Sequence, residues 1–200
     1  RRQLILSLLF ASIIILSTYT SIDIGGYNIN TRVIGAIAAG LLGGPLVGMY
    51  ASMIGAVYVY FFSSPSAFAG ASAFSTALFG LLGGGFYPYF QRGKWEYKDL
   101  FFLTCFAEVA DMVVILRMTQ PFELAFHTVL EVAGPMIILN SIGILLFISS
   151  FNNVFIRQDM ESSRQLYLAS EVSRKCMGIL RNGLKNEADI DKAADIILKE

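Results

Sequence analysis

The sequence predicts an all-α fold: a polytopic membrane helix bundle with a short-helix hairpin at a Gly-Gly-Pro break, followed by a cytoplasmic helical extension. Composition is the first observation behind this prediction. Of 200 residues, 55% are hydrophobic and 15% are charged, whereas a soluble domain carries about 25% charged residues. The uneven charge is the second, because residues 1–152 hold 14 charged side chains and residues 153–200 hold 16. A soluble globular enzyme, a disordered protein and a disulfide-stapled secreted domain are therefore excluded.

Repeated apolar runs of bilayer length are the third observation. A helix needs about 20 apolar residues to cross the hydrocarbon core. The run at 33–62 would form about 45 Å of helix, which is too long for one crossing, and it contains the helix breaker Gly43-Gly44-Pro45. We expect two short helices here, with a single tilted helix kinked at Pro45 as the alternative. The six predicted membrane segments are residues 3–20, 31–43, 45–62, 67–90, 100–118 and 126–150.

The distribution of basic residues predicts the orientation, because cytoplasmic loops are enriched in Lys and Arg. Arg1-Arg2 and the basic loop at 91–99 fall on the same side only if residues 31–62 cross the membrane twice. This supports the hairpin independently of the Gly-Gly-Pro break, and it places both ends of the chain in the cytoplasm. The connections expected outside carry no Lys or Arg; they are residues 20–30, 63–66 and 119–125.

Arg32 is the sharpest candidate binding residue, because ionisable side chains within membrane segments are costly and usually functional. It follows Asn30 and Thr31 at the start of an apolar helix, on the expected outer side. A guanidinium can hold a carboxylate through two parallel hydrogen bonds, and a helix N-terminus favours an anion. The alternatives are an arginine that reaches lipid headgroups and an ion pair with Glu108 or Asp111.

Glu108 and Asp111 are three positions apart in the middle of a predicted span, so they share one helix face. Two carboxyls that close together in low dielectric tend to share a proton or recruit a cation. A proton relay is one interpretation. The favoured one is a structural partnership with Arg32, or with Asn140 and Ser141.

Other polar residues within the spans are weaker candidates. Ser72, Ser75 and Thr76 share one helix face, where hydroxyls bind a ligand or simply an i−4 carbonyl. Pro135 is expected to kink the last span and free a carbonyl near its middle. No His, Cys or Asp cluster has the spacing of a metal site and no catalytic constellation is present, so we expect neither metal nor cofactor in these residues. A net charge of zero gives no indication of nucleic-acid binding.

Residues 153–183 predict a linker or signalling helix that leaves the membrane. Apolar residues recur there at intervals of three and four, which would allow pairing with a second copy in a homodimer. Residues 184–200 are expected to open a further domain, so the chain is interpreted as part of a longer protein. The apolar stripe consists of Leu166, Ala169, Val172, Cys176 and Ile179.

Several short motifs, taken in order, resemble one family over essentially all 200 residues. Each motif is loose alone, but their order and spacing together resemble the membrane sensor of LytS-type histidine kinases, the 5TM-5TMR-LYT domain, including the pyruvate-sensing kinases. The motifs are Asn-Thr-Arg at 30–32, Gly-Leu-Leu-Gly-Gly-Pro at 40–45, Gly-Leu-Leu-Gly-Gly at 80–84, Gly-Pro-Met at 134–136 and Asn-Ser-Ile-Gly at 140–143.

This resemblance implies a bacterial receptor dimer in the cytoplasmic membrane. Residues 1–152 would be the transmembrane sensor domain and residues 184–200 the start of a truncated GAF-like domain. A histidine kinase domain, with ATP and Mg²⁺, would follow and would phosphorylate a LytTR-type response regulator. The enzyme activity would therefore belong to the parent protein, with membrane lipid and a small ligand as the partners of these residues.

The resemblance also implies a ligand site for a small carboxylate. In pyruvate-sensing relatives two arginines, a Cys and a Ser meet the ligand. Arg32 and Ser75 match the first arginine and the Ser, and Ser72 stands at the position of the Cys. The position of the second arginine falls near Phe61, and no arginine is present there. A small carboxylate that is more apolar than pyruvate, or that has a neutral tail, would therefore better suit an aromatic-lined pocket in this chain. The predicted ligand-binding residues are Asn30, Thr31, Arg32, Phe61, Ser72 and Ser75, and the predicted structural or coupling residues are Glu108, Asp111, Pro135 and Asn140.

We expect the membrane sensory module of a two-component sensor kinase, which relays ligand binding to a cytoplasmic kinase. A substrate-binding membrane subunit of a vitamin transporter is the first alternative, because broken short helices are typical of transporters. The second keeps the sensor but couples it to a cyclic-dinucleotide cyclase. A purely structural scaffold is disfavoured by the ionisable residues within the spans.

Overall fold

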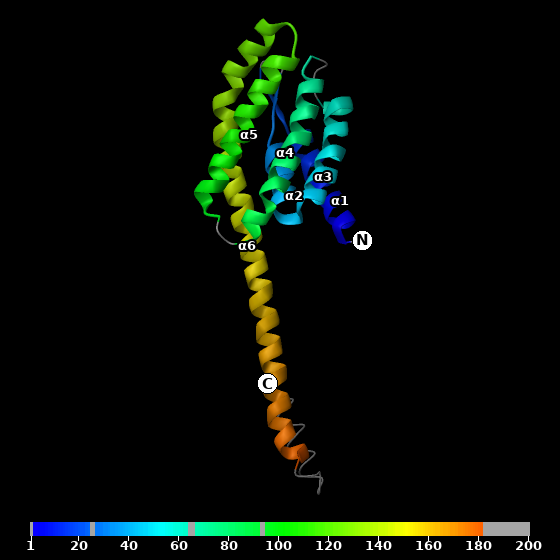
Figure 1. Ribbon diagram of the computed structural model, residues 1–200, viewed down its shortest axis with the longest axis vertical. Helices are drawn as coiled ribbons and strands as arrows, with labels where there is room; N and C mark the ends of the chain where they lie inside the picture. Colours follow the sequence, from blue (N-terminus) through cyan, green and yellow to red (C-terminus); the bar gives the residue numbers. More distant parts are fainter. Residues whose placement is uncertain (1, 25–26, 64–66, 93–94, 182–200) are drawn as a thin grey trace. The chain divides into compact units, whose positions relative to one another are not determined.

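The computed structural model describes residues 2–24, 27–63, 67–92 and 95–181, and it divides the chain into two compact units, Arg1–Ile148 and Ser149–Glu200. The first unit confirms the predicted all-α membrane bundle. Its helices lie side by side, α1 to α4 alternating in direction (Figure 1). They are α1 (Arg2–Tyr19), α2 (Arg32–Gly43), α3 (Pro45–Tyr58), α4 (Ala69–Gln91), α5 (Tyr97–Met118) and the first part of α6 (Phe122–Arg181).

Four stretches of the described chain are long and apolar enough to cross a membrane, which supports a multi-pass membrane protein. α5 is not among them within the described ranges. Two of its carboxyls, those of Glu108 and Asp111, lie in the middle of the helix, and both are buried inside the bundle. Its outward-facing side chains include Phe102 and Phe106, which suit contact with lipid. The four stretches are Arg2–Tyr19, Pro45–Phe62, Ala69–Gln91 and Phe122–Phe151.

The Gly-Gly-Pro break separates two helices, so the alternative of one kinked helix over residues 31–62 is wrong. Gly44 has φ +91°, a left-handed conformation that glycine adopts without steric cost. Pro45 is the first residue of α3, where its missing N–H would have no partner in any case. The chain therefore reverses at this point and α3 returns beside α2. α3 continues into a π-helix, η1 (Val59–Ser63).

Five glycines bring α2, α3 and α4 into backbone contact, and we call this set (Gly40, Gly48, Gly80, Gly83 and Gly84) the glycine crossing. A Cβ at Gly40 would collide with the backbone of Gly83 and Gly84. A Cβ at Gly48 would lie 2.6 Å from the Gly80 carbonyl oxygen. Membrane helices associate closely where small residues allow it, so this crossing holds the three helices in one arrangement.

A short β-hairpin departs from the all-helical expectation in the part of the chain that the structure describes. Strands β1 (Ile22–Ile24) and β2 (Tyr27–Ile29) pair antiparallel, with Ile22 opposite Ile29. The sequence predicts only a polar connection over residues 20–30. Ile29 is buried with residues of α4, α5 and α6, such as Met112 and Val132. The hairpin thus leads the chain into the bundle, and α2 begins in the interior.

α6 is one helix of 60 residues that continues from the first unit into the second. It runs through residue 152, where the sequence suggested a domain boundary. Pro135 lies within it. The side chains of the apolar stripe at 166–179 and the whole of the GAF-like segment 184–200 lie outside the described residues, so both predictions stay predictions.

Candidate functional site

Arg32 is the first residue of α2 and is buried, with 2% of its side chain exposed. The turn from β2 into α2 sets this position. The Arg32 backbone N–H donates to the Asn30 side-chain oxygen, with 3.2 Å between nitrogen and oxygen, and such a local bond stabilises a tight turn. Asn30 is buried as well, whereas Thr31 between them is exposed. Of the predicted motif, the structure thus brings Asn30 and Arg32 into the interior.

Asn140, in α6, links this turn to α5. Its Nδ2 donates to Glu108 Oε1 at 2.7 Å and to the Asn30 backbone oxygen at 3.2 Å. Glu108 is fully buried, and both the Arg32 guanidinium and the Asp111 carboxyl interact with it electrostatically. Residues from three distant parts of the sequence therefore form one group. We call Asn30, Arg32, Glu108, Asp111 and Asn140 the polar cluster.

The predicted hydroxyl groups of α4 are buried as well. α2 and α4 run in the same direction, with Gly40 opposite Gly84. Thr76 Oγ1 donates to the Ser72 carbonyl oxygen at 2.7 Å. Ser72 and Ser75 are buried beside it. The predicted α4 face is thus turned into the protein rather than toward lipid.

Several buried polar atoms have no hydrogen-bond partner among the described residues, and we call these atoms open. The open donors are Nε and Nη2 of Arg32, and the open acceptors are Oε2 of Glu108 and Oδ1 of Asn140. The hydroxyls of Ser72 and Ser75 are open too. Because buried polar groups in native proteins are nearly always paired, these atoms indicate an interior that receives water or a ligand.

Phe61, a predicted ligand residue, lies elsewhere. It belongs to η1 and is 70% exposed. It lines a pocket of about 520 Å³ together with Gly70, Ala71 and Met118, where η1, α4 and α5 meet. The pocket reaches the residue before Ser72 on α4. Phe61 is therefore a surface residue at the end of the bundle where α4 begins.

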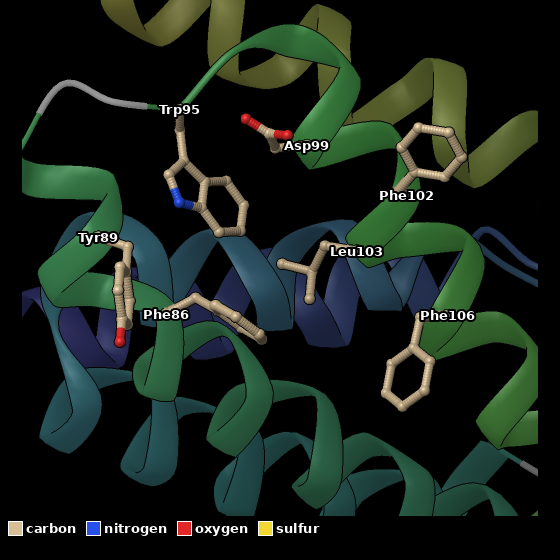
Figure 2. Close-up of a pocket in the computed structure, with 7 residues that line it drawn as sticks. All are labelled: Phe86, Tyr89, Trp95, Asp99, Phe102, Leu103 and Phe106. Atoms are coloured by element: carbon tan, nitrogen blue, oxygen red, sulfur yellow. The ribbon is translucent and has the colours of Figure 1, made fainter.

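A second hollow lies between α4 and α5 and holds about 570 Å³ (Figure 2). Its lining is mainly aromatic, and the rings of Phe86 and Trp95 are 5.4 Å apart between centroids. Its one carboxylate, Asp99, already accepts the Glu96 N–H at 2.9 Å and caps α5. Aromatic residues at helix ends are typical of the membrane–water interface. The complete lining is Phe86, Tyr89, Trp95, Asp99, Phe102, Leu103 and Phe106.

Sequence reasoning missed two parts of the candidate site. The Asn30 backbone oxygen receives the Asn140 amide, and the hairpin carries Asn30 into the bundle. In the sequence, only an apolar residue, Ile29, next to a turn-forming Asn points to the burial of Asn30, and this signal is weak. Of the two α6 residues predicted as partners of Glu108 and Asp111, Asn140 bonds Glu108, whereas the Ser141 hydroxyl lies 3.3 Å from Cys105 Sγ.

The comparisons with known proteins agree on one family. The family profile described as 5TMR of 5TMR-LYT matches residues 1–154. The chain is 31% identical to the sensor histidine kinase BtsS of Escherichia coli K12, over 96% of this chain and 35% of that protein. It is 27% identical to the sensor protein LytS of Staphylococcus haemolyticus, over 100% of this chain and 37% of that protein. The chain spans about a third of the length of these relatives. No solved structure matches it.

Proposed function

The chain belongs to the 5TM-5TMR_LYT family of LytS-type sensor kinases, and from this premise we propose that its polar cluster binds a small carboxylate ligand and passes the signal to α6. The membrane sensory role follows from the family. The ligand class rests on the open donors of Arg32.

A carboxylate is the natural partner for those donors. A guanidinium presents its N–H groups in a fork that matches the two carboxylate oxygens. Arg32 stands at the N-terminus of α2, where the helix dipole favours negative charge. In low dielectric such a contact is stronger than in water. The pocket lined by Phe61 and Ala71 ends one residue before Ser72 along α4.

Asn140 provides the connection to the output. Its amide holds both the turn before Arg32 and the Glu108 carboxyl, and it sits on the helix that continues to Arg181. A ligand at Arg32 that binds one conformation of this turn more tightly than another favours that conformation. Because Asn140 bonds the turn, the same ligand also shifts the conformational equilibrium of α6. The polar cluster thus joins the ligand site to the only helix that extends beyond the first unit in the described chain.

The remaining parts of the function extend beyond this chain. Sensor histidine kinases are among the relatives, so the proposed output is a kinase domain that uses ATP and Mg²⁺ and a response regulator of the LytTR type. A homodimer, a GAF-like domain from residue 184 and cytoplasmic chain ends complete the proposal.

Thermal unfolding of the purified chain in detergent tests the ligand class. Small carboxylates, pyruvate among them, are titrated against the native chain, Arg32→Ala and Arg32→Gln. A ligand at 100 times its Kd stabilises by about 2.7 kcal/mol, which corresponds to a rise of about 5–10 °C in a chain of this size. The rise should be absent in both Arg32 variants. It should persist in Arg117→Ala, because Arg117 is exposed at the end of α5.

A carboxylate whose shift survives both Arg32 substitutions would contradict the proposal. The absence of any saturable shift across the panel would do the same.

A further inference from the structure

We propose that the ligand is a zwitterion, a small α-amino acid, whose carboxylate is held by Arg32 and whose ammonium group is held by Glu108 and Asn140. This inference rests on the proposed function and narrows it, because it replaces carboxylates in general by one chemical class. Two independent observations carry it: the balance of buried charges and the sign of the open atoms.

The buried charges do not balance for a plain carboxylate. The polar cluster contains one guanidinium, that of Arg32, and two carboxyls, those of Glu108 and Asp111, all buried. Two carboxyls this close in low dielectric share a proton, so the charges of the three groups sum to zero. A simple carboxylate would bring the sum to −1 in a low-dielectric interior, where uncompensated charge is strongly disfavoured. An amino acid brings a carboxylate for Arg32 and an ammonium for the acidic side, and it leaves the sum unchanged.

The open atoms call for the same kind of ligand. The open donors belong to Arg32, and they require an acceptor such as a carboxylate. The open acceptors are Glu108 Oε2 and Asn140 Oδ1, and they require donors. An ammonium group has three N–H donors and no acceptor. A keto acid has acceptors alone, so it would leave the Glu108 and Asn140 oxygens unsatisfied, and a buried unsatisfied group is costly.

The two kinds of open atom border the same group of residues. Asn140 Nδ2 lies 3.2 Å from the Asn30 carbonyl oxygen, two residues before Arg32, and 2.7 Å from Glu108 Oε1. The Arg32 charge interacts with Glu108. An α-amino acid carries its two charged groups on one carbon, which suits a site where a cation and a carboxyl interact with each other.

Matched acids that differ at one carbon test the inference. Alanine, lactate, pyruvate and propionate share three carbons and differ in the group on the second carbon. Leucine against 4-methylpentanoate and phenylalanine against 3-phenylpropionate repeat the comparison with larger side chains. The readout is the concentration that gives half of the maximal thermal shift of the chain in detergent. In at least one series, the amino acid should act at a concentration at least 10-fold lower than its analogue without the amine.

Glu108→Gln tests the ammonium contact, since it keeps the shape and removes the charge. The half-maximal concentration of the deaminated analogue, divided by that of the amino acid, should fall at least 10-fold in this variant. Glu131→Gln is the matched control, because Glu131 is exposed on α6, and its ratio should equal that of the native chain. Asp111→Asn is the second variant, to be used if Glu108→Gln does not fold, and it should lower the ratio in the same direction.

The outcomes separate this inference from the proposed function. An acid without an amine that binds through Arg32 as tightly as its amino acid overturns the zwitterion and leaves carboxylate binding intact. A ratio unchanged in both acidic-residue variants also overturns it. The absence of a shift in every series overturns both.

Discussion

The two ends of α2 are built on opposite principles. At Gly40, the glycine crossing brings three helix backbones so close that a single Cβ does not fit. At Arg32, eight residues earlier, the polar cluster is linked by hydrogen bonds yet keeps open donors and acceptors. The glycine crossing is closely packed and has no room for a ligand. The polar cluster has donors and acceptors that a ligand can bind, so the rigid part and the ligand-responsive part lie at different positions along one helix.

The physical reason lies in the membrane. Between helices in lipid, apolar side chains gain little by leaving one apolar environment for another, so close van der Waals packing carries the association. Polar groups in low dielectric interact strongly but are costly when unpaired. A receptor can therefore use small residues to hold its helices and reserve its polar residues for the signal. The following substitutions test this contrast, in order of decreasing expected effect.

Gly40→Ala should have the largest effect, because the added Cβ meets the backbone of Gly83 and Gly84 and no side chain can move aside. Overpacking costs about 1–3 kcal/mol in ordinary cores, and we expect about 3 kcal/mol or more here. Thermal unfolding and the yield of monodisperse protein in detergent measure it. The control is Gly85→Ala, where a Cβ meets no described atom within 4 Å. Equal stability of the two variants would contradict the glycine crossing.

Asn140→Leu should have a smaller effect on stability and a larger one on signalling. It removes two hydrogen bonds, to Glu108 and to Asn30. Side-chain hydrogen bonds between membrane helices average about 0.6 kcal/mol, so we expect a loss of about 1–2 kcal/mol. Arg32→Gln should alter hydrogen exchange along α6, and Asn140→Leu should abolish that alteration.

Ser141→Ala is the matched control for this coupling. Ser141 follows Asn140 on α6 and contacts Cys105 of α5 at 3.3 Å, away from the Arg32 turn. The response of α6 to Arg32→Gln should persist in this background. A response that persists equally in the Asn140→Leu background would show that α6 is coupled to the site by another route.

Ser75→Ala should have the smallest effect on the ligand-free chain. The Ser75 hydroxyl is open, so its removal breaks no hydrogen bond within the described residues. The free energy of unfolding should therefore change by less than about 0.5 kcal/mol. The same substitution should weaken the ligand-dependent shift. Thr76→Val is the comparison, since its hydroxyl donates to the Ser72 oxygen at 2.7 Å. A stability loss for Ser75→Ala as large as for Asn140→Leu would place Ser75 in the structural part of the bundle.

Much of the helical framework could be predicted from local sequence. The break at Gly44-Pro45 was readable because a left-handed glycine and a proline at a first helical position act on the backbone alone. The hairpin at 22–29 was not readable. Its strands have three residues each, too few for a periodic pattern, and Ile29 is buried by helices that follow much later in the chain.

The candidate site divides in the same way. Arg32 and Glu108 were identified because a charge in an apolar run is costly wherever it lies. The sequence also offered Asn140 as a partner of Glu108, and the two are hydrogen-bonded. That Asn140 reaches the Asn30 backbone as well, and that Phe61 lies at the surface, depended on the folded chain.

The sequence by itself determined the membrane class, the helices and the residues that carry charge into the bilayer, since hydropathy and backbone freedom are properties of neighbouring residues. Only the tertiary structure decided which of those residues meet. Asn30 and Asn140 are 110 positions apart, and the close packing of α2, α3 and α4 at the glycine crossing is part of the framework within which such distant groups come together. The open atoms of the polar cluster, which determine the chemistry of the proposed ligand, result from this tertiary arrangement.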